Sequence, residues 1–420
     1  MEKQRYYLCI DMKCFFASVE CAERGLNPFE TNLVVADETR GRGSICLAIS
    51  PKMKSLGVKN RCRVYEIPHN IEYITAKPRM AKYIEYAADI YEIYLGFVAK
   101  EDIHVYSIDE AFLDVTEYLD LYELNAEELA ERIINRIAEV KRIPATAGIG
   151  TNLYLAKIAL DITAKHSRTH IGFLDEELFI KTLWKHRPLS DFWGISAGTC
   201  RRLKKYNVYD MEGIAKLDER FLYKEFGVNA EILIDHAYGR EPCLMKDIKG
   251  YKAKSHSIST SQILFEDYDY DKAKIVIEEM ALNCCQRLMK EKRIARSVGV
   301  FVGYSRDTVP SSGGVMKMSE STNVFSIIMK YVVELYEKHT DRTQPIRRLM
   351  IDFGGLCDES CAGYDLFTDF DKVEKERAGE RAVIDIKTKY GKNAIIRGAD
   401  LQEGATQITR NKLIGGHNGE

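Results

Sequence analysis

The sequence lacks the cysteine spacing that disulfides or zinc would need. Its 11 cysteines are scattered over 420 residues, no two form a C-x-x-C pair, and some, such as Cys9 and Cys46, lie inside apolar runs. Structural zinc needs clustered ligands, which the nine histidines do not supply. This spacing favours reduced, mostly buried thiols in a cytosolic protein.

Long apolar runs are also absent. No stretch approaches the ~18 residues of a membrane-spanning helix, and the N-terminus, MEKQRYYLCIDM, has no apolar segment of signal-peptide length. We therefore expect a cytoplasmic protein with no membrane partner. A chain of 420 residues is too long for one ordinary hydrophobic core, which predicts roughly two to four domains.

A strong net charge is missing as well, because 61 basic residues face 63 acidic ones. The basic residues nevertheless gather in three clusters: Arg201, Arg202, Lys204 and Lys205; Arg287, Lys290, Lys292, Arg293, Arg296 and Arg306; and Arg342, Arg347 and Arg348. Charge clusters are more often solvated surface than binding sites, so they favour a polyanionic partner only weakly.

Hydrophobic periodicity predicts an α/β multidomain chain. Strands are expected at 5–11, 32–36, 44–49, 103–108, 111–115 and 145–150, and helices at 15–24, 52–56, 78–99, 126–141 and 152–165. This order indicates a mixed sheet covered by helices on one face. Short helices are expected to about residue 240, then a linker-like stretch, a strand–helix–strand–strand–helix–strand unit at 255–353, and a polar tail without a clear core.

Three carboxylates form the pattern that most strongly suggests a catalytic site. Asp11 closes one expected strand, and Asp109 and Glu110 occupy the turn between two others. Carboxylates at adjacent strand ends repel one another unless cations lie between them, and magnesium prefers such oxygen ligands. Two ions ~3.5–4 Å apart can hold the attacking and leaving oxygens of a phosphoryl displacement. An isolated Asp–Glu dipeptide would be a solvated turn, but the strand-terminal Asp11 disfavours that interpretation.

Three ordered motifs resemble the Y family of DNA polymerases, in its bacterial UmuC-like and DinB-like branch. They are CIDMKCFFASVE (Cys9–Glu20), YSIDEAFLDV (Tyr106–Val115) and AGIGTNLYLAKIALDITAK (Ala147–Lys165), with weaker support from SPKMKSLGVK (Ser50–Lys59) and from 191–206. The resemblance implies a right-hand polymerase. Its parts would be a ferredoxin-like palm (1–24 and 77–173), small fingers (25–76), a helical thumb resembling a helix-hairpin-helix (174–240), a linker (241–254), an α/β little finger (255–356) and a C-terminal tail (357–420).

The resemblance also implies the function. Such an enzyme is a template-directed lesion-bypass DNA polymerase of low fidelity, active in DNA repair and SOS damage tolerance, and small fingers that close loosely discriminate less. It uses two Mg²⁺ ions, for which Mn²⁺ can substitute. Its partners would be primer-template DNA, deoxynucleoside triphosphates and the sliding clamp. The segment GYDLF (Gly363–Phe367) faintly resembles a clamp-docking peptide, although the usual leading glutamine is missing.

The site residues follow from the same resemblance. Asp11, Asp109 and Glu110 would be catalytic and bind the metals, with the Met12 carbonyl completing one metal shell. The nucleotide site would include Phe15, Phe16, Lys54 and Lys157. Within it, Phe16 takes the sugar-sensing position, whereas core packing explains Phe15 better. The DNA contacts would be Gly194, Gly198, Arg201 and Arg202 in the thumb, and Arg293, Arg296, Arg347 and Arg348 in the little finger.

The fingers depart from the family pattern. Many members carry a tyrosine and an arginine that grip the triphosphate, and the aligned residues here are Pro51 and Lys54. Lys54 keeps the charge without the bidentate fork of arginine, and Pro51 has no N–H to donate. Lys13 is also unusual beside the metal site, and we expect it to affect nucleotide preference.

Three other functions are alternatives to the polymerase. A nucleotidyl cyclase on a similar palm would need no basic thumb or second DNA-gripping domain. A metal-dependent nuclease would usually bring a histidine or lysine into the motifs to activate water. A non-catalytic DNA- or clamp-binding relative would be expected to lose a carboxylate, yet all three are present. The polymerase interpretation is favoured in each comparison.

Overall fold

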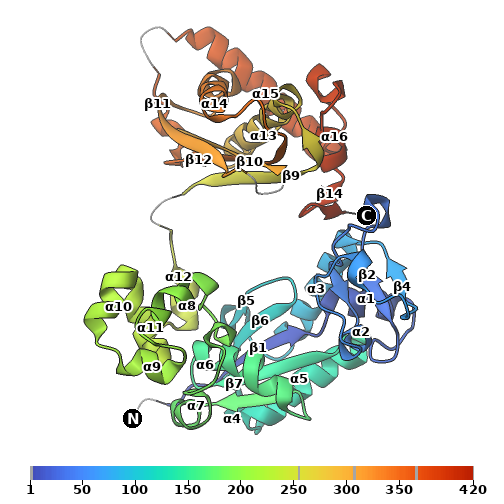
Figure 1. Cartoon of the computed structure of the whole chain (residues 1–420), viewed down its shortest axis with the longest axis vertical. Coiled ribbons are helices and arrows are strands. Elements are labelled where there is room, and N and C mark those ends of the chain that lie inside the picture. Colours follow the sequence, from blue (N-terminus) through green and yellow to red (C-terminus); the bar gives the residue numbers. More distant parts are fainter. Residues whose placement is uncertain (1–2, 254–255, 306–308, 365–367, 420) are drawn as a thin grey trace. The chain divides into compact units, whose positions relative to one another are not determined.

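The computed structural model describes residues 3–253, 256–305, 309–364 and 368–419. The chain divides into two compact units, one formed by Met1–Tyr251 with His417–Glu420 and the other by Lys252–Gly416. Most of the first unit is coloured blue to green in Figure 1, and the second is yellow to red. Each unit has its own sheets and core.

A five-stranded mixed sheet forms the centre of the first unit (Figure 1). Its strands run in the order β5-β6-β1-β7-β8, and all neighbours are antiparallel except β7 and β8. The strands are β1 (Tyr7–Met12), β5 (Ile103–Val105), β6 (Glu110–Asp114), β7 (Ala145–Gly150) and β8 (Ile171–Leu174). The predicted mixed sheet is therefore confirmed.

Helices cover both faces of this sheet, so the prediction of one covered face is wrong. On β1, Leu8 and Ile10 belong to the core formed with α1 (Phe15–Glu23), α3 (Met80–Leu95) and α5 (Ala126–Lys141). Tyr7 and Cys9 point the other way and pack against α6 (Leu153–Ile158). A strand whose successive residues are all buried needs cover on both sides. The short helix α4 (Tyr118–Tyr122) lies between β6 and α5 in sequence.

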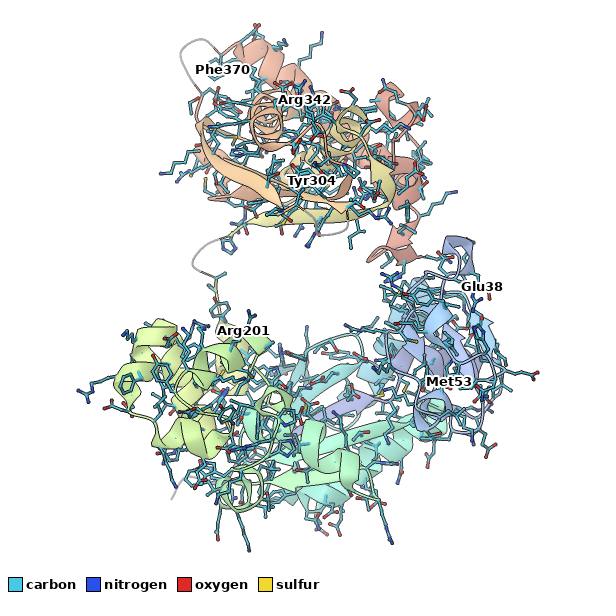
Figure 2. All side chains as sticks on the ribbon, viewed as in Figure 1. Glu38, Met53, Arg201, Tyr304, Arg342 and Phe370 are labelled. Atoms are coloured by element: carbon cyan, nitrogen blue, oxygen red, sulfur yellow. The ribbon has the colours of Figure 1, made fainter. Side chains whose placement is uncertain are left out.

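A smaller sheet follows α1, with the strand order β3-β2-β4. It consists of β2 (Leu33–Val35), β3 (Ala48–Ile49) and β4 (Ile74–Ala76), so the strand predicted at 44–49 is much shorter. The helix α2 (Pro51–Ser55) begins after Ser50, whose hydroxyl oxygen accepts a hydrogen bond from the Met53 N–H. Met53 is fully buried in this small core, and its place on α2 is labelled in Figure 2.

Residues 175–250 form helices and turns, which confirms the predicted loss of strands. The helices are α7 (Glu176–Leu183), α8 (Ala197–Lys204), α9 (Met211–Lys216), α10 (Glu219–Phe226), α11 (Ala230–Ala237) and α12 (Met245–Gly250). The last of them lies inside the stretch predicted as a linker. Met245 is buried in one cluster with Tyr7 and Phe112 of the sheet, so an apolar anchor holds this lysine-rich stretch against the first unit.

The second unit contains an antiparallel sheet with the strand order β11-β10-β12-β9. Its elements are β9 (Ile258–Tyr268), α13 (Tyr270–Lys290), β10 (Arg293–Tyr304), β11 (Ser312–Thr322), α14 (Phe325–His339) and β12 (Ile346–Gly354). The two helices share one buried core with the sheet. This order confirms the predicted strand–helix–strand–strand–helix–strand unit.

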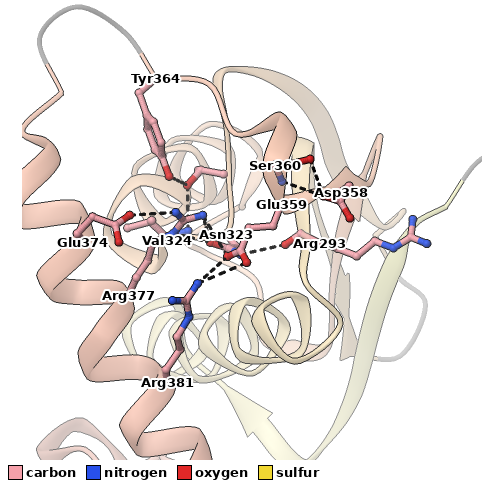
Figure 3. Close-up of polar contacts among 11 residues, drawn as sticks. Arg293, Asn323, Val324, Asp358, Glu359, Ser360, Tyr364, Glu374, Arg377 and Arg381 are labelled. Atoms are coloured by element: carbon pink, nitrogen blue, oxygen red, sulfur yellow. Dashed lines mark hydrogen bonds and ion pairs between the residues drawn. The ribbon is translucent and has the colours of Figure 1, made fainter.

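The stretch after residue 356 is not a polar tail without a core, as the sequence predicted. Its elements are β13 (Cys357–Asp358), α15 (Phe370–Tyr390), α16 (Gln407–Arg410), β14 (Leu413–Ile414) and β15 (His417–Asn418). In α15, Val373 packs beside Val324 and Ile327. Arg377 is buried and donates hydrogen bonds to Asn323 and Glu359 (Figure 3). The charges that suggested a solvated tail are therefore partly buried and paired.

The Arg377 network predicts a large loss of stability when this side chain is removed. Arg377→Met removes the donors to the Asn323 amide oxygen and takes away the buried cationic partner of Glu359. We therefore expect a cost of about 3 kcal/mol in unfolding free energy. Arg381→Met removes an exposed arginine that contacts the same Glu359 and should cost less than about 1 kcal/mol. Urea denaturation followed by circular dichroism, with hydrogen–deuterium exchange of α15, measures both. Equal losses in the two variants would contradict the prediction.

Candidate active site

Strand register brings two of the three predicted carboxylates together. Asp11 at the end of β1 pairs directly with Glu110 at the start of β6. Directly opposed residues of an antiparallel pair project from the same face of the sheet. That face also carries Cys9, two residues before Asp11, and it is the face covered by α6.

Asp109 lies in the turn that precedes β6. Its carbonyl oxygen accepts a hydrogen bond from the Met12 N–H at 2.9 Å, which ties the turn to the end of β1. The Ser107 hydroxyl donates to the Asp109 carboxylate at 2.6 Å. The predicted tight junction between two strands is confirmed, and it places the three carboxylates at the neighbouring ends of β1 and β6.

Lys157 of α6 compensates part of this negative charge. Its Nζ lies 2.8 and 2.9 Å from the two carboxylate oxygens of Glu110, and 3.2 Å from Asp161. Burial alone would lower the pKa of Lys157, but the hydrogen bond to Glu110 and the nearby acids raise it above its usual value. The Cys9 thiol also donates to Glu110, at 3.2 Å. Glu110 is therefore paired with a buried ammonium.

Asp11 forms no ion pair with a basic side chain in the described part of the chain. Burial, together with the charges of Asp109 and Glu110, raises the pKa of Asp11 to about 7. Among the described residues, no three His, Cys, Asp or Glu side chains are already arranged around one point as metal ligands. The donor set still fits a hard divalent cation. The carboxylates lie at neighbouring strand ends, and Lys157 neutralises only part of their negative charge.

Two glycines allow α6 to reach the sheet. A Cβ at Gly148 would lie 2.2 Å from the Ala156 carbonyl oxygen, and a Cβ at Gly150 would lie 2.1 Å from the Ala156 nitrogen. Only glycine permits such a close approach of backbones. Their purpose is therefore packing, in agreement with the absence of a phosphate-loop spacing. The predicted helix at 152–165 changes to a π-helical turn at Ala159–Thr163, a feature that often marks functional sites.

Comparisons with known proteins decide the family. The sequence model described as impB/mucB/samB matches residues 10–161, and the model of that family's C-terminal domain matches 255–366. A UV-damage repair protein, UvrX, of Bacillus subtilis (strain 168) is 31% identical over 419 residues, covering 98% of this chain and 97% of that protein. DNA polymerase IV 2 of the same strain is 30% identical over 426 residues, covering 99% and 100%. The chain belongs to the Y family of translesion DNA polymerases.

A solved structure agrees with this assignment at the level of the fold. A Y-family DNA polymerase chimera, Dbh-Dpo4(243-245)-Dbh, matches with a TM-score of 0.61 and 21% identity, covering 84% of this chain and 99% of that one. The predicted family, fold class and enzyme class are confirmed. The polymerase acts on DNA and nucleotides in damage repair and tolerance, and its chemistry depends on divalent metal. In the described residues, no helix has the length and apolarity to cross a bilayer.

The two phenylalanines of the polymerase's first motif have different surroundings. Phe15 is buried in the core of the first unit. Phe16 is half-buried, and its ring stacks on Tyr83 with 4.6 Å between centroids. The Tyr83 hydroxyl donates to the buried Glu20 carboxylate at 2.9 Å, which fixes the ring behind Phe16. This placement agrees with core packing for Phe15 and leaves Phe16 accessible.

Lys13, which lies in the first motif, has His170 and Lys54 as neighbours. Lys13 Nζ lies 3.0 Å from His170 Nδ1. Burial and the neighbouring lysine hold the pKa of His170 below its usual value, so the neutral ring accepts the hydrogen bond. Lys54 is exposed on α2, and its charge influences Cys14 and Lys13. The structure thus brings Lys54 and Lys13 into one neighbourhood, whereas Lys157 lies with the carboxylates.

The predicted DNA contacts of the thumb lie around the start of α8. Gly194 has a positive φ of 83°, which a tight turn before the helix requires, and Gly198 lies in the first turn. Arg202 is engaged within the helical region at residues 175–250, since it donates to the Glu225 carbonyl oxygen at 2.7 Å. Arg201 is exposed (Figure 2), and within the described residues its side chain forms no hydrogen bond or ion pair.

The predicted DNA contacts of the second unit fall into two separate pairs. Arg293 and Arg296 lie at the start of β10, whereas Arg347 and Arg348 lie at the start of β12. Because Arg348 pairs with Gly303 near the other end of β10, the strand rise separates the pairs by about 23–33 Å. Arg347 also contacts Asp267 at 3.4 Å. The four arginines therefore do not form one patch.

Sequence reasoning missed several neighbours of the site. Asp161 was detectable, because it follows Lys157 by four residues and so shares its helix face. Cys9 precedes Asp11 by two residues in a strand, which places both on one face. His170 and Trp193 carried no local signal, since their contacts depend on the tertiary fold. The clamp-like segment lies partly outside the described residues, because only Gly363 and Tyr364 of it are described.

Proposed function

We propose that Asp11, Asp109 and Glu110 form the catalytic centre of template-directed primer extension, with two Mg²⁺ ions bound between them. The register pair of Asp11 and Glu110, with Asp109 bound to Met12 through the backbone, carries this proposal. The Met12 carbonyl would complete one metal shell. When bound, the ions would activate the primer 3′ hydroxyl and stabilise the charge of the leaving pyrophosphate, and Mn²⁺ would substitute.

The other residues position the substrates. Lys157, on the same face as the carboxylates, would contact the triphosphate as a point charge. Lys54 and Lys13 would supply the remaining positive charge from the fingers side. Phe16, backed by Tyr83, would lie under the sugar and exclude a 2′ hydroxyl. Together these residues would favour deoxynucleoside triphosphates.

The partners of this polymerase follow from its charges. Primer-template DNA would contact backbone N–H groups near Gly194 and Gly198 and the side chain of Arg201, which grip phosphates without reading sequence. The four predicted arginines of the second unit would bind the DNA backbone as two separate pairs. The sequence of Gly363–Phe367 supports docking on a sliding clamp as part of the proposal. A cytoplasmic location is also proposed, because bacterial DNA and nucleotides are found in the cytoplasm.

Replacing one carboxylate tests the catalytic centre. Asp109→Ala should lower the rate of primer extension by about two to three orders of magnitude, because a preorganised charge is lost. Asp120→Ala is the matched control, since it removes an exposed carboxylate of the same unit that contacts Lys3. Primer extension on an undamaged template with Mg²⁺ and four deoxynucleotides measures both. Full activity of Asp109→Ala would contradict the assignment.

Phe16→Ala tests sugar selection. Opening the space under the sugar should raise the ratio of ribonucleotide to deoxynucleotide incorporation about tenfold or more. Phe15→Ala should instead destabilise the core by about 3–5 kcal/mol without changing that ratio. Single-nucleotide incorporation kinetics with matched ribo- and deoxynucleotides provide the measurement. An unchanged ratio in Phe16→Ala would remove Phe16 from the nucleotide site.

We expect different effects from replacing the two neighbouring arginines of α8, one on DNA binding and the other on stability. Arg201→Ala should reduce the slope of log affinity for DNA against log salt by about one, as expected for one lost phosphate contact. Arg202→Ala should mainly lower thumb stability, because Arg202 donates to the Glu225 carbonyl oxygen and lies over the Phe226 ring. Fluorescence anisotropy at several salt concentrations and thermal melts distinguish them. The same change of slope in both variants would contradict this division.

A further inference from the structure

One hydrogen bond joins the thumb to the catalytic turn of the first unit. The Trp193 Nε1–H donates to the Tyr106 hydroxyl at 3.0 Å, and the two rings meet edge to face at 6.2 Å and 72°. Trp193 immediately precedes Gly194 in the thumb segment that begins α8. Tyr106 begins the turn that carries Asp109 and Glu110. The contact therefore links the proposed DNA grip to the proposed catalytic centre.

Tyr106 is bound closely to the catalytic residues. Its backbone N–H donates to the Glu110 carbonyl oxygen at 2.9 Å, and its ring centre lies 5.8 Å from Lys157 Nζ. The ring also packs edge to face on Phe112 at 5.8 Å. Lys157 is only 7% exposed whereas Tyr106 is 45% exposed, so the tyrosine lies on the solvent side of the Lys157–Glu110 pair. A displacement of Tyr106 would reach both the turn and the lysine.

Trp193 also makes a second set of ring contacts, which reaches the helix that carries Lys157. Its ring lies 6.1 Å from His236. His236 stacks on Tyr154 at 3.8 Å and 12° and pairs with Glu241 at 3.0 Å. Tyr154 belongs to α6, three residues before Lys157. Trp193 is therefore connected to Lys157 in two ways: through His236 and Tyr154 of α6, and through Tyr106.

We propose that the Tyr106–Trp193 hydrogen bond is a positioning contact that couples DNA held by the thumb to the alignment of Lys157 and the carboxylate turn. This inference rests on the proposed function of the same site. A duplex phosphate bound beside Gly194 would fix Trp193, and Trp193 would fix Tyr106 against the turn. Small misplacements of reacting groups cost large factors in rate, so the contact acts on the chemical step more than on DNA affinity.

The test removes each polar partner and keeps an aromatic ring at each position. Tyr106→Phe and Trp193→Phe should each lower the single-turnover rate with saturating primer-template about three- to tenfold, the scale of one neutral hydrogen bond. DNA affinity, measured by fluorescence anisotropy, should stay within about twofold, since neither polar group is proposed to touch DNA. The double variant should be no slower than the slower single variant, because both changes remove the same bond.

A matched control separates coupling from general support of the thumb. Trp184→Phe removes another indole N–H of the thumb, which donates to the Ala237 carbonyl oxygen at 2.8 Å, and it should keep the wild-type rate. The inference is overturned if Tyr106→Phe and Trp193→Phe keep the wild-type rate, or if their effects multiply in the double variant. It is also overturned if the losses of rate follow a loss of folded protein in thermal melts, or if Trp184→Phe is equally slow.

The proposed function is tested separately in the same assay. Wild-type extension that is lost in Asp109→Ala supports the catalytic centre whatever the phenylalanine variants do. In that case a failure of the coupling test removes only the role of Tyr106 and Trp193. A wild-type protein that binds primer-template and does not extend it overturns both.

Discussion

The close approach of α6 to β7 is the constraint on which the site depends. Gly148 and Gly150 leave no Cβ between the two backbones, so the helix lies directly on the strand. That distance lets Lys157 reach Glu110 from the helix, on the face where Asp11 also projects. A bulkier strand residue would push the helix away and leave three neighbouring carboxylates without their internal cation. The close packing of α6 on β7 is therefore also what allows Lys157 to neutralise charge at the carboxylates.

The parts of this site that could be predicted are those with a local cause. Asp11 and Glu110 lie at strand ends, and strand ends can be read from apolar runs in the sequence. The bounds of α5 were predictable for a similar reason: Asn125 and Glu128 form a capping box at its start. The contact between Lys157 and Glu110 was not predictable, because it joins residues 47 positions apart and depends on how α6 crosses the sheet.

Charged residues explain the main errors of the fold prediction. The segment after residue 356 is rich in acidic and basic side chains, which favours solvated coil when only composition is considered. In the structure Arg377 bonds to Asn323, 54 residues earlier, and the packing of Val373 anchors the same helix. The helix α12 was missed for a similar reason, because Met245 and Ile248 are its few apolar anchors among lysines. Composition does not reveal which charges find distant partners.

The observed bonds of Lys157 to Glu110 and Asp161 compete with the contact to the triphosphate that we propose for it. An ammonium group has three N–H donors, and the carboxylates of Glu110 and Asp161 supply oxygens for all of them. If Lys157 contacts the triphosphate as proposed, it must give up at least one of these bonds. The oxygen that it gives up would most usefully be that of Glu110, which is proposed as a metal ligand. Nucleotide binding would then free the carboxylate at the moment when it is needed, and before that the buried charges would stay paired.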